Sequence, residues 1–169
     1  MNVPAAAPKR RRSQSSAAQL LTPRQICRGH LRFGWISLGC FCLLGIFLES
    51  LHGFKIEWYL SESMAARRGC WLAAHASGTC LSLLHIVFAA TVVYLTDWRP
   101  KSRLVTSYSL YSATVLIPAG FLLAGCFLRD AKPGMGIGLV LAAALLLLSV
   151  LLATATNTMS QRAAAELVV

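Results

Sequence analysis

Charged side chains are scarce in this chain of 169 residues. They make up 13% of the sequence, whereas a typical soluble domain contains about 25%. So few charges cannot cover the surface of a water-soluble globule, and that class of protein is excluded. Apolar residues take their place, with a hydrophobic fraction of 56% and a mean hydropathy of +0.61. The length suits one domain, and the composition predicts an integral membrane protein.

Several short motifs of catalytic and metal-binding proteins are also missing. The sequence contains no CxxC pair, no CxxCH motif for covalent haem attachment and no HExxH motif of a zinc protease. Gly134, Gly136 and Gly138 follow no strand pattern, so they do not form a nucleotide-binding loop. No Ser-His-Asp arrangement stands out either. The sequence leaves open whether the chain is an enzyme.

The six cysteines form no obvious framework. Cys40, Cys42 and Cys80 lie in apolar runs, where cysteine behaves as a small hydrophobic residue. Cys70 and Cys126 both fall near the predicted outer face, so a disulfide between them is one possible arrangement. Sequence spacing alone cannot fix that pairing.

Positive charge is abundant, with a formal net charge of +10. It is concentrated in the N-terminal segment and one short loop, which favours membrane topology and anionic lipid over a nucleic-acid partner. Residues 1–30 contain little that could form a core, and we expect a disordered basic cytoplasmic tail. This tail contains a basic cluster formed by Lys9, Arg10, Arg11 and Arg12. The cluster could bind lipid headgroups or remain solvated. A short amphipathic helix on the membrane surface is expected within residues 20–32.

Four apolar runs follow and are long enough to span a bilayer, for which about 20 residues suffice. Backbone groups in lipid must pair within one segment, so the runs should be helical. The predicted fold is an all-α, four-helix transmembrane bundle over residues 31–159, with a short cytoplasmic tail at 160–169. An interfacial segment, which could contain a short surface helix, is expected between the first two spans. The predicted spans are 33–51, 69–95, 104–128 and 135–156.

The distribution of Lys and Arg predicts the orientation. Eleven of these residues fall on the side that holds both termini, and five fall on the other. The richer side is cytoplasmic by the positive-inside rule, so both termini are expected inside, in a bacterial-type inner membrane. The five outer residues are Lys55, Arg67, Arg68, Arg129 and Lys132.

Two histidines interrupt the second span. At 100° per residue, His75 and His85 share one face with small and hydroxyl residues, Gly78, Thr79 and Ser82. Such a stripe should face the bundle interior. The two rings are either buried neutral imidazoles bonded to hydroxyls, with Thr114 as the expected partner of His85, or groups that handle a ligand, cofactor or proton. About 15 Å of helix separates them, so they cannot share one metal ion.

A second group of residues suggests a metal site. Glu49 and His52 are three residues apart and would be neighbours on a helix, and His75 begins the next span at a similar depth. Together they could offer one carboxylate and two imidazoles to zinc or iron(II), or to haem through His52 or His75. The alternative is an ion pair of Glu49 with a histidine or with Arg67 or Arg68.

The other two spans carry fewer signals. Pro118 should kink the third span, whose tyrosines, Tyr108 and Tyr111, lie near its inner end. The fourth span is rich in leucine, which indicates a scaffold, with Gly134-x-x-x-Gly138 as a candidate helix contact.

Three classes of function remain open. The first is a structural, interaction or accessory-subunit protein, which could form a homo-oligomer or join a partner membrane subunit. The second is a metal- or haem-binding redox or transport subunit that uses the membrane-embedded histidines. The third is a membrane-embedded enzyme on a small apolar substrate. Its basis is the motif Ala-His-x-x-Gly at residues 74–78, which resembles that of integral membrane proteins similar to hydroxylaminobenzene mutase and implies mutase-like activity.

Overall fold

The computed structural model describes residues 21–95, 97–128 and 136–166, and about 91% of them are helical. Within these ranges there is no strand, and four helices are long and apolar enough to cross a membrane. For these residues the predicted all-α fold is confirmed, as is the presence of four helices able to span a membrane. Residues 1–20, with the predicted lipid-binding cluster, lie outside the described part, as do residues 129–135.

The long helices extend beyond the predicted spans at most of their ends. The first is α2 (Pro23–Gly53), which begins ten residues before the predicted start. Two short elements, α3 (Glu57–Leu60) and η1 (Glu62–Met64), occupy the predicted interfacial connection. The remaining helices are α4 (Ala65–Tyr94), α5 (Pro100–Cys126) and α6 (Gly136–Glu166). Helix α2 therefore begins within the segment expected to be the N-terminal tail, and α6 continues past residue 160.

A capping box explains why α2 begins so early. The Thr22 hydroxyl accepts a hydrogen bond from the backbone N–H of Gln25, and the Gln25 side chain accepts one from the backbone N–H of Thr22. Pro23 occupies the first turn, where its missing N–H costs no hydrogen bond. These polar residues lie outside any apolar run, so hydropathy alone places the start of the helix too late.

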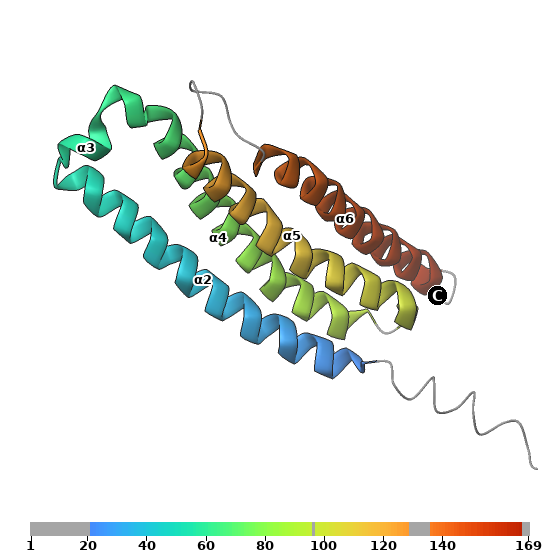
Figure 1. Cartoon of the computed structure of the whole chain (residues 1–169). Coiled ribbons are helices and arrows are strands. Elements are labelled where there is room, and N and C mark those ends of the chain that lie inside the picture. Colours follow the sequence, from blue (N-terminus) through green and yellow to red (C-terminus); the bar gives the residue numbers. More distant parts are fainter. Residues whose placement is uncertain (1–20, 96, 129–135, 167–169) are drawn as a thin grey trace, which may run out of the picture.

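Helices α4 and α5 form the centre of the molecule, with α2 and α6 on opposite sides of them (Figure 1). The most apolar windows of α4 and α5 are 39% and 44% buried, but those of α2 and α6 are only 11% and 17% buried. The core joins all four helices through two clusters, and the larger one contains Ile26, Phe88, Val92, Leu95, Trp98, Leu110 and Val150. Most of the outer surface of α2 and α6 is therefore exposed.

Arg68 holds the connection between α2 and α4 in place. Its guanidinium donates hydrogen bonds to the backbone carbonyls of Tyr59 and Ser61, and it lies 5.6 Å from the centre of the Tyr59 ring. Arg68 is one of the alternative partners expected for Glu49, and in the structure it makes these contacts with the connection. Charge-assisted bonds and a cation–π contact together order a segment that has few buried residues of its own.

We predict that Arg68→Ala loosens this connection. Loss of the guanidinium leaves the Tyr59 and Ser61 carbonyls without a donor, so amide hydrogen exchange at residues 57–64 should accelerate about tenfold, which corresponds to about 1.4 kcal/mol. Arg67→Ala is the matched control, one residue away. Equal exchange rates in the two variants would show that Arg68 does not order the segment.

Candidate functional site: a buried histidine pair

Two histidines from different helices meet in the interior. His30 of α2 and His85 of α4 are both fully buried, and their Nδ1 atoms are 2.6 Å apart. The other ring nitrogens bind hydroxyls of α5: His30 Nε2 is 2.7 Å from Ser107 Oγ, and His85 Nε2 is 3.0 Å from Thr114 Oγ1. One chain of hydrogen bonds therefore joins three helices.

Aromatic rings enclose the pair. Tyr111 of α5 stacks on His30, with ring centres 4.4 Å apart, and lies 4.8 Å from His85. Phe33 contacts His85, and Phe88 contacts His30, each with ring centres 4.7 Å apart. This apolar enclosure limits the hydrogen-bond partners of the imidazoles to the side chains that touch them, so every ring nitrogen depends on one specific neighbour.

The position of each hydrogen in this series of hydrogen bonds follows from its last acceptor, the Leu110 carbonyl. The Thr114 hydroxyl donates to the Leu110 carbonyl at 2.8 Å, because a carbonyl has no hydrogen to give. Thr114 Oγ1 must therefore accept from His85 Nε2–H, which leaves Nδ1 of a neutral His85 as an acceptor. His30 then donates from Nδ1, and its Nε2 accepts from the Ser107 hydroxyl. Neutral imidazoles of opposite tautomers satisfy the whole chain.

The predicted bond between His85 and Thr114 is confirmed, and so is the inward direction of the polar stripe on α4. Gly78, Ser82 and His85 are buried, while His75 and Thr79 are half-buried. His85 also has a partner histidine from another helix, since His30 of α2 lies beside it. Sequence analysis missed His30 because it assigned that residue to the tail.

His75 lies apart from the pair and binds backbone. Its Nδ1 is 2.7 Å from the Phe41 carbonyl of α2, so Nδ1 carries the hydrogen. The ring fits because Gly45 faces it: a Cβ at Gly45 would overlap the imidazole. In the same contact, a Cβ at Gly78 would overlap the Phe41 ring. Close packing of α2 on α4 accounts for the position of His75.

The expected convergence of Glu49, His52 and His75 is not found. Glu49 and His52 are exposed on the last turns of α2, whereas His75 turns toward Phe41. The residue of α2 that is buried here is Leu48, at 2% exposed, and one residue is a 100° rotation, which carries Glu49 off that face. Across the ranges that the structure describes, no three His, Cys, Asp or Glu side chains gather to hold a metal ion.

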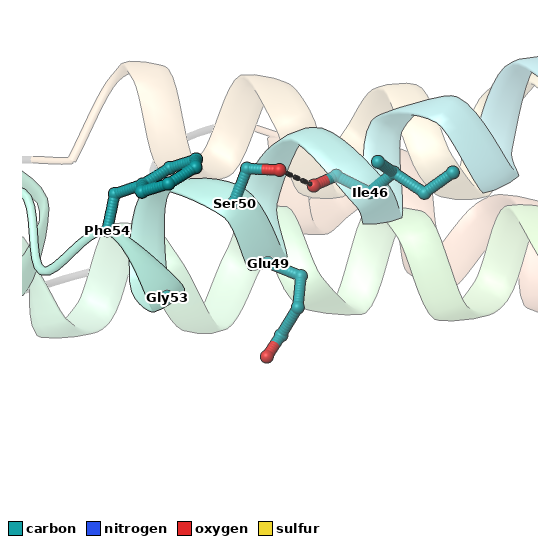
Figure 2. A pocket seen from close by; sticks show the side chains of 5 residues that line it. All are labelled: Ile46, Glu49, Ser50, Gly53 and Phe54. Carbon is teal, nitrogen blue, oxygen red and sulfur yellow. Dashed lines mark hydrogen bonds between the residues drawn. The ribbon is translucent and has the colours of Figure 1, made fainter.

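Glu49 instead lines an open groove on α2 together with Ile46, Ser50, Gly53 and Phe54 (Figure 2). The Ser50 hydroxyl bonds back to the Ile46 carbonyl at 2.7 Å, which leaves the carboxylate as the free polar group among the side chains drawn. Figure 2 shows this carboxylate extending away from the helix, with none of the other labelled side chains toward it. The groove belongs to one helix only.

The hydrogen bonds of His85 and His75 limit which of their ring nitrogens could bind a metal ion or haem. Both ring nitrogens of His85 are engaged, so a haem or metal ion would have to displace Thr114 or His30. His75 keeps Nε2 for a further contact. All six cysteines are free thiols in the structure, including Cys70 and Cys126.

Comparisons with protein-family models, with curated proteins and with solved structures found no match. Function must therefore be argued from this chain's own residues.

Proposed function

We propose that this chain is a small polytopic integral membrane protein of the structural or accessory-subunit type, with both termini in the cytoplasm. The proposal is supported by the division of the fold into two buried central helices and two outer helices that bury little of their own surface. A buried network of neutral side chains holds α2, α4 and α5 together, as expected of a scaffold that presents α2 and α6 outward.

The observation that carries an accessory role is the position of Glu49. It lies four residues before Gly53, the last residue of α2, which is about 6 Å along the axis. A carboxylate on the outer surface of a spanning helix is costly unless a donor meets it. We infer that a helix of a partner membrane subunit packs along the groove and offers Glu49 a basic side chain.

Site-specific photo-crosslinking in native membranes tests this inference. A photoreactive residue at Ile46 should give a discrete protein adduct that is lost when Glu49→Gln is added, because the neutral amide cannot form the ion pair. The same probe at Leu145, an exposed position of α6, is the control. The accessory role would be contradicted by lipid adducts alone at Ile46, whereas an adduct with a second copy of this chain would replace the partner by a homo-oligomer.

The orientation has its own test in a cysteine-free background. Lys101→Cys, in the first turn of α5, should react with a membrane-impermeant thiol reagent only after the cells are opened. Ser63→Cys, in η1, should react in intact cells, because the two positions lie at opposite ends of the helices. The reverse pattern would show that the positive-inside rule fails for this chain.

A further inference from the structure

We propose that His30 and His85 form a binding site for one exchangeable proton, and that Ser107 and Thr114 set the path along which it enters. This goes beyond the proposed scaffold role, which needs only the neutral network. The starting point is the 2.6 Å distance between the two Nδ1 atoms. At that separation one nitrogen must carry a hydrogen and the other must not.

The distance favours a proton over a metal ion. Two imidazole nitrogens bound to the same tetrahedral zinc, each about 2.0–2.1 Å from it, are about 3.3 Å apart. The pair would have to open to admit such an ion. It already fits a single N–H···N hydrogen bond, whose hydrogen can belong to either ring.

A proton can be added without breaking any of these hydrogen bonds. It forms a new N–H bond at His30 Nε2, and the Ser107 hydroxyl rotates so that its oxygen accepts where it had donated. His30 is then an imidazolium that donates at both nitrogens, and His85 Nδ1 still accepts. Transfer to His85 breaks the His30 Nδ1–H bond and forms the His85 Nδ1–H bond. One positive charge is present before and after this step.

The site has room for only one such proton. With both rings charged, two N–H groups would face each other across 2.6 Å, so the helices would have to separate. The histidine pair thus binds one proton and no more while the helices stay packed.

The neighbours of the pair can stabilise a charge spread over two rings. The titratable group that faces it from α5 is the Tyr111 phenol, and the phenylalanines Phe33 of α2 and Phe88 of α4 fill the other contacts. No Asp, Glu or Cys completes a group of three with the pair among the residues the structure describes. The Tyr111 ring stacks on His30 and presents its face to a cation there, whereas Phe33 and Phe88 are tilted to the imidazoles. The added charge would therefore be stabilised by aromatic rings and not by a carboxylate.

The path also has a direction across the bundle. Ser107 lies seven residues into α5 and Thr114 seven residues further, so each interval is about 10 Å along the axis. Protons would enter at Ser107, on the side of the bundle where α5 begins, and go no further than His85, whose Nε2–H the Thr114 hydroxyl already accepts. The carbonyl of Leu110 ends the chain, since it accepts only.

Nitrogen-15 NMR of the full-length chain in lipid bilayers, labelled at histidine, tests the proposal. At about pH 8 we expect one ring protonated at Nδ1 and the other at Nε2, assigned to His30 and His85 through H30Q and H85Q. Between about pH 8 and about pH 3 the pair should take up one proton, and both rings should shift together. Exposed His52 lies outside the pair, and its resonances serve as the internal reference.

Three results would overturn the proposal: identical tautomers in the two rings, independent uptake of two protons, or no uptake over this range. S107A adds a second test that keeps both rings. Without the hydroxyl at His30 Nε2, the tautomer preference should weaken in both histidines, while the spectrum of His75 stays unchanged. Unchanged tautomers in S107A would show that Ser107 does not determine which ring nitrogens carry hydrogen. None of these readouts depends on a partner subunit.

Discussion

Replacing His85 by alanine is expected to lower the free energy of unfolding by about 3 kcal/mol. The substitution removes the ring that touches His30, Phe33 and Tyr111, and leaves a cavity whose cost adds to that of the lost contacts. It also leaves the His30 Nδ1–H and the Thr114 hydroxyl oxygen without their partner. Reversible unfolding by denaturing detergent in mixed micelles measures the loss.

A double-mutant cycle separates the pair from simple loss of volume. His30→Ala and His85→Ala should each be strongly destabilising, but the double variant should cost about 1–2 kcal/mol less than their sum, because the second substitution no longer strands a donor or acceptor. His75→Ala is the matched control. Its half-buried ring has one bond to a carbonyl, and we expect a loss of about 1 kcal/mol. Additive effects of His30 and His85 would contradict a coupled pair.

The four spans could be predicted because an apolar run of this length is too hydrophobic for a water-exposed helix and long enough to cross a bilayer. The ends of these helices could not be predicted from hydropathy, because capping residues and charged residues determine where a helix begins and ends. Arg24, Arg28 and Arg32 made the start of α2 resemble a basic tail, yet all three are exposed on one side of a helix. On the other side Ile26, His30 and Gly34 are buried at the same four-residue spacing. That alternation was the available signal for His30.

The partners of the histidines depended on how the helices are rotated, which sequence spacing leaves open. His85 could be matched with Thr114 because both lie at a similar depth in neighbouring spans. One contact explains both the position of His75 and the separation of Glu49 and His52 from it. Small residues bring α2 and α4 together, with Gly45 against His75 and Gly78 against Phe41. This contact fixes the rotation of α2 and leaves Glu49 and His52 exposed.

The largest effect outside the histidine pair is expected at Gly136, the first residue of α6. A Cβ there would overlap the Gly120 carbonyl oxygen of α5 and lie 2.5 Å from the backbone nitrogen of Ala124. Backbone atoms cannot rotate away as a side chain can, so Gly136→Ala should force α6 off α5 and destabilise the chain by about 3 kcal/mol.

Gly138→Ala provides the control for this prediction, two residues further along α6. A Cβ at Gly138 meets no atom within 4 Å, so the helix contact predicted from Gly134-x-x-x-Gly138 is made by Gly136 in the described part of α6. Alanine at Gly138 should leave stability unchanged or raise it by a few tenths of a kcal/mol, because alanine favours helix. Unfolding of both variants in denaturing detergent measures the difference, and equal stability would show that α6 does not depend on close backbone contact with α5.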